Sequence, residues 1–449
     1  MRRLEFPFYL SVGVGMALSC SSFMMVAGLF EVTSLLWILL ALVLGCVFCG
    51  ALALSIGELA GMYPSAPAIV TYFKAAFGDR IALMFIYLYL VFIVLIAGVE
   101  SYLFGKVAEA VVPGLPPLAV VVVLLVSVVT ANLLGLELPR LIQMVLTAAA
   151  VAVILVLGVA GAVRSPGATA DALGTGNVLS SLGLVPAAVG LTVFLFMGFE
   201  WVTPVGLRPD AYARKIPWAM PAAVAILFVA YALFLVGIGA TLPRSAFKDE
   251  LIPQVPFFAD VLGGTGKYLA GILSLSAIVS TFNAGMMSAS RLIYAVARQG
   301  YLPRFVATIR PSTGAPVGGV LLLGSLGLAS AFVVGGLGLQ LVAAVVGATI
   351  ICAIYAGYIG SALRLRARDP DRPRPFRSPL PAGVQKGVIG LLAIIGAASL
   401  FSLPDRIPEA VVGGALSALV AYLLSGWSIR RSPRPALARR GVAPSARAR

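Results

Sequence analysis

The sequence predicts an all-α integral membrane protein with about twelve transmembrane helices. Its 449 residues are 60% hydrophobic and only 11% charged, and the mean hydropathy is +1.04. Soluble chains carry about 25% charged residues. The surroundings of this chain are therefore lipid, and a helical bundle of this length can form one unit.

Apolar runs of about 20 residues, the length that spans ~30 Å of hydrocarbon, recur between Gly- and Pro-rich breaks. The expected helices cover residues 8–30, 35–60, 81–104, 118–134, 141–163, 182–206, 219–242, 269–295, 317–334, 341–363, 384–403 and 411–429. The remaining segment, residues 430–449, is rich in Arg, Pro, Ala and Ser and is expected to be a disordered basic tail.

The net charge of +15 predicts orientation in the membrane. With both termini in the cytoplasm, the outer side holds six of the 32 basic residues and leaves 26 inside. These six are Lys106, Arg164, Arg244, Lys248, Lys267 and Arg406. We therefore expect a multi-pass protein of the cell membrane (inner or plasma membrane) with cytoplasmic termini, whose inner arginines contact membrane lipid, and no nucleic-acid partner.

Enzyme chemistry is not expected. Histidine is absent, which excludes imidazole metal ligands and Ser-His or Cys-His pairs. The sequence also lacks a paired-carboxylate or metal-ligand cluster, so we expect no metal and no cofactor. The spacing of Cys46 and Cys49 is read as small residues on a membrane helix rather than as a redox motif.

One carboxylate is expected deep in the membrane, where ionisable residues mark functional sites. Glu200 follows Gly198, which can break the sixth helix. We predict that Glu200 takes part in substrate or proton binding, with a structural hydrogen bond between helices as the alternative. Glu100, about 20 residues or ~30 Å from the inner start of its helix, is expected near the outer surface.

The first helix has a comparable interruption of small residues, Ser19, Cys20, Ser21 and Ser22, whose hydroxyls could satisfy an unwound backbone. Close helix packing by small residues is the alternative.

Paired interruptions in the first and sixth helices predict a five-plus-five inverted repeat. The expected boundaries are residues 1–163 for helices one to five and 182–367 for helices six to ten, with the last two helices in 384–429.

Four motifs resemble those of the amino acid-polyamine-organocation (APC) transporters, and the similarity covers nearly the whole chain up to the tail. They are residues 57–66 (GELAGMYPSA), 196–200 (FMGFE), 288–300 (SASRLIYAVARQG) and 370–377 (PDRPRPFR). The resemblance implies a LeuT-type fold, alternating access, and an amino acid or amine bound between the first, third, sixth, eighth and tenth helices.

The resemblance also implies site residues. A substrate carboxylate would meet the amides of 19–21, where the family has Gly-Ser-Gly and this chain has bulkier side chains, followed by Ser22. The amine would meet the sixth-helix break around Phe196, Gly198 and Phe199, and Phe194 stands where the family often has an aromatic gate.

Ion coupling is left open between three routes. The fifth-helix lysine of several proton-coupled members is replaced here by Ala150. Coupling could occur by protonation of Glu200, by exchange, or through a sodium site that includes Ser280 and Thr281, whose hydroxyls could instead serve helix packing. Burial favours a protonated carboxyl, and a bound cationic amine favours a carboxylate. Glu200 could therefore release its proton when an amine binds and take up a proton when the amine leaves.

The sequence therefore predicts an APC-type amino acid permease, a secondary active transporter of an amino acid. A polyamine or organocation transporter is the alternative within this class. A membrane receptor without turnover and a channel are the alternatives outside it. The substrate, the coupling ion (H+ or Na+), the direction of transport and the oligomeric state are not determined by the sequence.

Overall fold

The computed structural model describes residues 5–64, 68–136, 139–164, 184–205, 209–248 and 250–431. These residues form α-helices and short 3₁₀ segments, without strands. The helices are α1 (Glu5–Ala17), α2 (Cys20–Val32), α3 (Leu35–Met62), α4 (Ala68–Phe77), α5 (Asp79–Val111), α6 (Pro117–Leu133), α7 (Arg140–Arg164), α10 (Val185–Phe196), α11 (Pro209–Arg214), α12 (Ile216–Thr241), α13 (Gln254–Leu262), α14 (Gly266–Arg298), α15 (Val317–Gly336), α16 (Gln340–Arg368), α17 (Ala382–Ser399) and α18 (Ile407–Arg431).

The predicted all-α membrane fold is confirmed. Within the described ranges, ten helical segments are long and apolar enough to cross a membrane, and the bent pair α1–α2 makes an eleventh. The shorter apolar helix α6 packs against α5 and α15 and corresponds to the fourth expected span. The sequence did not predict α4, α11 or α13, because helices of ten or fewer residues are too short for a membrane-length apolar window.

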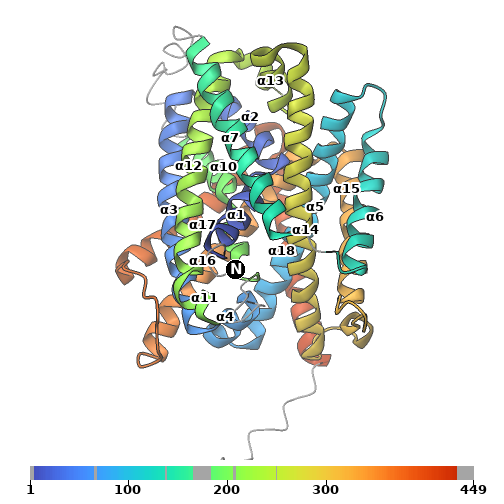
Figure 1. Ribbon diagram of the computed structural model, residues 1–449. Helices are drawn as coiled ribbons and strands as arrows, with labels where there is room; N and C mark the ends of the chain where they lie inside the picture. The colour runs from blue at the N-terminus through green and yellow to red at the C-terminus, as the bar shows by residue number, and fades with distance from the viewer. Residues whose placement is uncertain are drawn as a thin grey trace, which may run out of the picture.

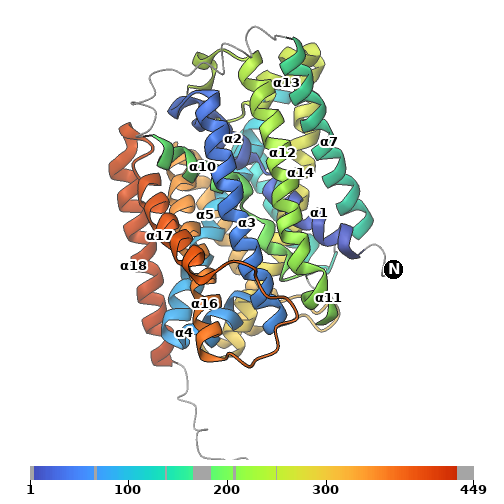
Figure 2. The ribbon, with the colours of Figure 1, turned by 90° about the vertical axis from the view of Figure 1, so that its left-hand side faces the viewer.

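The helices form one upright bundle with two distinct ends (Figure 1). We call the end that carries α4 and α11 the α4 side, and the opposite end the α13 side. The interior holds α1, which contacts α7, α12 and α14. Both α17 and α18 lie on one flank of the bundle, and α18 ends on the α4 side (Figure 2).

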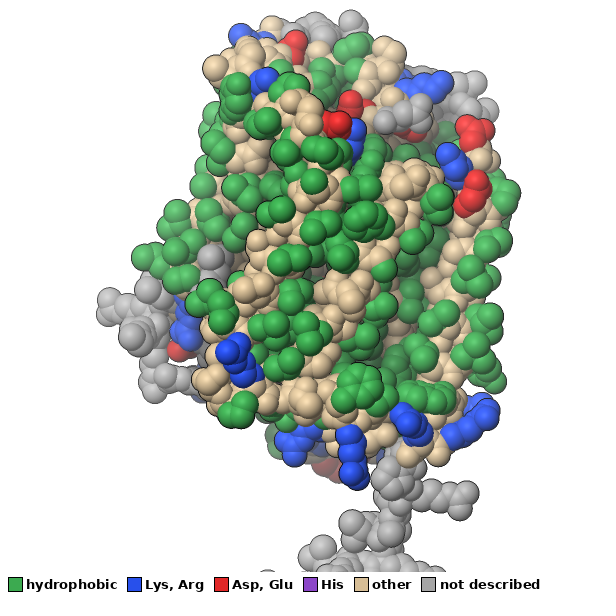
Figure 3. All heavy atoms as spheres, turned by 90° about the vertical axis from the view of Figure 1, so that its right-hand side faces the viewer, with side chains coloured by type: hydrophobic (Ala, Val, Ile, Leu, Met, Phe, Trp, Pro, Cys, Tyr) green, Lys and Arg blue, Asp and Glu red, His purple; other side chains and the backbone are tan. Residues whose placement is uncertain are grey.

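The outer surface between the two ends is apolar, as a lipid-facing surface must be. Side chains such as Val47, Val123, Val156 and Ile272 are more than half exposed. Figure 3 shows a broad hydrophobic zone on one flank, with blue Lys and Arg side chains gathered at its lower, α4-side edge. In water such a surface would aggregate, so its size agrees with a membrane setting.

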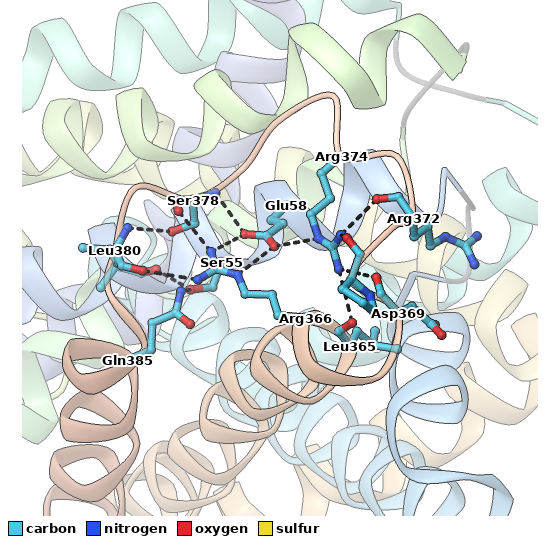
Figure 4. A network of polar contacts seen from close by, with 12 residues as sticks. Ser55, Glu58, Leu365, Arg366, Asp369, Arg372, Arg374, Ser378, Leu380 and Gln385 are labelled. Atoms are coloured by element: carbon cyan, nitrogen blue, oxygen red, sulfur yellow. Dashed lines mark hydrogen bonds and ion pairs between the residues drawn. The ribbon is translucent and has the colours of Figure 1, made fainter.

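A buried ion-pair network closes the bundle on the α4 side (Figure 4). The fully buried carboxylate of Glu58, on α3, accepts hydrogen bonds from Arg366 Nε at 2.8 Å and from Arg366 Nη2, and the backbone N–H of Ser378 donates to it at 2.9 Å. Arg374 Nε lies 3.3 Å from the same carboxylate. The network therefore ties α3 and α16 to the loop that precedes α17.

The arginines of this loop region were candidates for lipid contact, but the structure points several of them at protein groups. Arg366 donates to the carbonyls of Ser378 and Leu380, at 3.0 and 3.3 Å. Arg374 donates to the Asp369 carbonyl at 2.7 Å, and Arg372 lies 3.7 Å from the centre of the Tyr63 ring. Arg366 and Arg374 therefore cap backbone carbonyls, and Arg372, which is exposed, packs on an aromatic face.

The proposed repeat boundaries stay a prediction. Residues 182 and 183, where the second repeat is expected to start, lie outside the described residues, as do residues 432–449 of the expected tail.

We predict that Glu58→Gln lowers the free energy of unfolding by about 3–5 kcal/mol, because it leaves two arginines without their buried counter-charge. The matched control is Glu409→Gln, whose ion pair with Arg406 is 3.5 Å long and solvent-exposed and should contribute about 0–1 kcal/mol. Thermal unfolding of both variants in the same detergent measures the difference. Equal stability losses would contradict a central role for the network.

Candidate functional site

The first transmembrane span is broken at its middle. Helix α1 ends at Ala17, α2 begins at Cys20, and the two helices are bent by 52°. Ser19, between them, has an extended backbone with φ −122° and ψ 168°. The first amides of α2 therefore have no carbonyl partner in the preceding turn, and a buried helix end of this kind needs other partners.

Glu100 supplies those partners. Its carboxylate accepts the backbone N–H of Cys20 at 2.9 Å and that of Ser21 at 3.1 Å, and the Ser21 hydroxyl also donates to it. Only 1% of the Glu100 surface is exposed. The carboxylate thus fills the amide cradle at the N-terminus of α2, where the helix dipole favours a negative charge.

The expected position of Glu100 near the outer surface is therefore wrong. Helix α5 has 33 residues, which is about 50 Å at 1.5 Å per residue. It is longer than the hydrocarbon core, so a residue ~30 Å from its start need not lie at the far surface. The hydrogen bonds to Cys20 and Ser21 place Glu100 at the level of the α1–α2 break.

The carbonyl side of the same break is also satisfied. The Ala17 carbonyl accepts the Tyr231 hydroxyl at 2.7 Å and the Ser22 hydroxyl at 2.8 Å. The interruption predicted from Ser19 to Ser22 is thus a real break. The Ser22 hydroxyl donates to the freed Ala17 carbonyl, and the Ser21 hydroxyl donates to Glu100.

The sixth span is broken where the sequence predicted. Helix α10 ends at Phe196 and a 3₁₀ turn, η2 (Phe199–Val202), follows. Gly198 has φ +121°, and a Cβ atom at this position would lie 2.8 Å from the carbonyl carbon of Met16 and 2.9 Å from the Ala17 nitrogen. Only glycine fits here without strain. The two breaks therefore touch, backbone against backbone, at the centre of the bundle.

Glu200 is buried beside this second break. One carboxylate oxygen accepts the Gly198 N–H at 3.1 Å and the Tyr355 hydroxyl at 3.0 Å. The other oxygen has no hydrogen-bond partner among the described residues. Glu200 therefore joins the sixth span to α16, and its other oxygen can still accept a hydrogen bond.

A cavity of about 100 Å³ is lined by the two breaks, α5 and α14, with smaller contributions from α6 and α15. Its polar lining includes Glu100, Ser19, Ser21, Ser22 and Thr281. Its apolar lining is Met16, Phe92, Ile93, Val94, Ile96, Ala97, Leu125, Met197, Trp201, Phe282, Met286, Ala289, Leu323, Gly198, Gly285 and Gly327.

Of the predicted substrate-binding residues, Ser19, Ser21, Ser22 and Gly198 line this cavity. The lining does not include Cys20, Phe194, Phe196, Phe199 and Glu200. Phe194 and Phe196 are instead packed in the core, 1% and 0% exposed.

Glu200 lines a second cavity, of about 30 Å³, together with Tyr89, Thr203 and Ser288. Ile93, Trp201 and Ala289 line both cavities. Glu100 and Glu200 therefore face separate spaces, with Trp201 between them.

The two residues of the candidate sodium site point in different directions. Ser280 Oγ accepts the Gln143 amide N–H at 2.6 Å, and the neighbouring Thr147 hydroxyl donates to the Ser11 carbonyl at 3.2 Å. Neutral side chains thus link α1, α7 and α14. Thr281 faces the larger cavity, and its buried hydroxyl oxygen has no partner among the described residues.

Comparisons with known proteins identify the family. Residues 6–422 match the family model described as amino acid permease. The chain belongs to the amino acid permease family. It is therefore a membrane transporter and not an enzyme.

Two relatives illustrate the range of named substrates within these transporters. An "L-asparagine permease 2" of Mycobacterium bovis is 26% identical over 411 residues, which cover 86% of this chain and 82% of that protein. The "low-affinity putrescine importer PlaP" of Escherichia coli is 27% identical over 286 residues, which cover 62% of this chain and 63% of that protein.

Solved structures of an Eremococcus coleocola manganese transporter share the fold. A mutant of that protein superimposes with a TM-score of 0.60 at 14% identity, over 95% of this chain and 93% of the other. A complex with an aromatic bis-isothiourea compound gives a TM-score of 0.56 at 14% identity, over 95% and 94% of the two chains. The predicted LeuT-type architecture of this permease is confirmed.

The sequence reasoning missed Glu100 as a site residue, although one signal was present. Glu100 follows Gly98 inside an apolar stretch, and an ionisable residue in such a stretch marks a functional site by default. The sequence analysis did not include the full length of the permease's α5, which has 33 residues and brings Glu100 to the level of the α1–α2 break.

We predict that Gly198→Ala lowers the free energy of unfolding by about 1–3 kcal/mol, because the methyl group meets the backbone of α1 and alanine disfavours this φ. Gly50→Ala is the matched control, since a Cβ there meets no atom within 4 Å. Chemical or thermal unfolding of purified variants measures both. A fully stable Gly198→Ala protein would contradict the close contact of the breaks.

Proposed function

We propose that this permease carries an amino acid or a related amine through the cavity between its two broken spans by alternating access. The observation that carries the proposal is one partly polar cavity that both breaks line together with α5 and α14. Binding near the middle of discontinuous helices is how many secondary transporters hold their substrates. The relatives named for asparagine and putrescine support a small amino compound as the solute.

The proposed orientation places the α4 side and both termini in the cytoplasm of a cell-membrane protein. The six basic residues assigned to the outer side include Arg164, which donates to the Asp260 carbonyl of α13 at 3.2 Å, and Arg244, which donates to Phe30 at the end of α2 at 3.1 Å. The loop that precedes α17, whose Arg374 pairs with Glu58, lies toward the α4 side (Figure 2). This asymmetry supports the positive-inside assignment.

The geometry suggests how the site changes access. Because Gly198 packs directly on Met16 and Ala17, the two breaks must move together or lose their contact. Glu100 anchors the start of α2 to α5. We propose that α1 and the η2 turn rotate about this anchor, while α5 and α14, which line the cavity, stay in place.

We propose that Glu200 carries the coupling proton. It is buried, one of its oxygens has no described partner, and it lies at the moving break. The sodium alternative has less support, because the Ser280 hydroxyl already accepts a hydrogen bond from Gln143. Exchange without an ion is the competing route, and uptake measured with and without a pH gradient distinguishes the two.

The test of the proposed function is counterflow in proteoliposomes. Liposomes are loaded with one unlabelled amino acid or amine and supplied with the same labelled compound outside. A transporter accumulates label transiently, a receptor shows no uptake, and a channel shows no trans-stimulation. Absence of counterflow for every standard amino acid and simple amine would overturn the proposal.

We predict that Glu200→Gln keeps counterflow but loses stimulation by an inward proton gradient, because glutamine accepts the same hydrogen bonds and cannot bind or release a proton. Tyr355→Phe is the control, since it removes the hydroxyl from this carboxylate and leaves the carboxylate titratable. Uptake is measured with and without a pH gradient. Wild-type gradient stimulation in Glu200→Gln would exclude Glu200 as the proton carrier.

A further inference from the structure

The amide cradle at the start of α2 is a ready-made anion site that the protein itself has filled. Both oxygens of the Glu100 carboxylate are engaged, one by Cys20 N–H and one by Ser21 N–H. A second carboxylate cannot use these amides while Glu100 holds them. An amino acid bound here would also bring its own carboxylate beside a like charge, which is unfavourable in a buried site.

The charge of the cavity points to a cation. Among the described residues that line it, Glu100 is the only charged side chain, and no Lys or Arg lines it. Buried charges are normally paired. A carboxylate offers about four lone-pair positions, so Glu100 can accept further N–H donors from a ligand in addition to its protein bonds.

A second acceptor faces the same space. The Thr281 hydroxyl oxygen is buried, lines the cavity and has no hydrogen-bond partner among the described residues. An ammonium group has three donors and no acceptor. Glu100 and the Thr281 hydroxyl together match such a group.

The rest of the lining is apolar. Phe92, Ile96, Phe282, Met286 and Leu323 surround the space away from the serines. The second buried acid, Glu200, faces the smaller cavity beyond Trp201. The larger cavity therefore offers one place for positive charge and hydrocarbon surface for the remainder of the ligand.

We propose that the substrate of this permease is an organic amine that has one ammonium group, an apolar body and no carboxylate beside the ammonium. Glu100 takes the position that an amino acid's own carboxylate would otherwise occupy, and it holds the ammonium together with Thr281. This assignment rests on the proposed transport function, and it narrows the substrate from amino compounds in general to apolar amines.

The test compares ligands that differ only by a carboxylate. Binding of isopentylamine and leucine, and of 2-phenylethylamine and phenylalanine, is measured on the purified full-length protein in nanodiscs at neutral pH. We expect each amine to bind roughly 10–100-fold more tightly than its amino acid, the range expected for one charge-assisted interaction gained or lost. Amino acids that bind as tightly as their amines would overturn the proposal, and so would 1,4-diaminobutane binding more tightly than isopentylamine.

A variant tests the role of Glu100 itself. Glu100→Gln should weaken amine binding by roughly 10–100-fold and narrow the preference for amine over amino acid, because an amide can donate to a ligand carboxylate. Glu109→Gln is the matched control on the same helix, where the wild-type side chain is 39% exposed and paired with Lys106, and it should bind like wild type. An unchanged preference in Glu100→Gln would overturn the assignment, and the wild-type ligand pairs decide the matter if that variant does not fold.

Counterflow with the same ligands separates this inference from the proposed function. Amines that bind tightly but show no counterflow would refute transport and leave the binding assignment intact. Counterflow of leucine without counterflow of isopentylamine would support transport and refute the assignment.

Discussion

The structure depends on how the protein satisfies an opened backbone inside the membrane. A break between α1 and α2 leaves amides and a carbonyl where lipid and packed side chains offer no water. Glu100 accepts the amides, and Tyr231 and Ser22 donate to the Ala17 carbonyl. These bonds let the chain keep a bent, polar segment at its centre, and the contact of Gly198 with that segment places the second break beside it.

The way the break is satisfied also sets the electrostatics of the site. Because an acidic side chain fills the amide cradle, the cavity is lined by an acid and by no Lys or Arg among the described residues, while basic side chains gather at the α4 side of the molecule. There the Glu58 network uses carboxylate and carbonyl oxygens to hold arginines in fixed positions. Glu58 and Glu100, both buried, therefore have opposite surroundings, since Glu58 is paired with arginines and Glu100 faces a cavity whose described lining contains no Lys or Arg.

Much of the fold could be predicted from the sequence, because membrane thickness and apolar run length leave few choices. The breaks at Ser19 and Gly198 could also be predicted. Glycine can interrupt a membrane helix, and serine hydroxyls can satisfy the backbone groups that the interruption frees. The polar partners could not be predicted, because Glu100 lies 79 residues from Ser21 along the chain and only the length of α5 brings them together. The site roles of the aromatic residues stay predictions, and the sequence alone does not tell that Phe194 on α10 is buried in the core.

The central claim is that Glu100 remains in the amide cradle when substrate binds. A cryo-electron microscopy structure with bound isopentylamine tests it most directly. We predict that the Glu100 carboxylate stays on the backbone amides of Cys20 and Ser21, with the ligand nitrogen within hydrogen-bonding distance of that carboxylate. A structure in which Glu100 has left the cradle and a ligand carboxylate occupies those amides, obtained with leucine under the same conditions, would contradict the account.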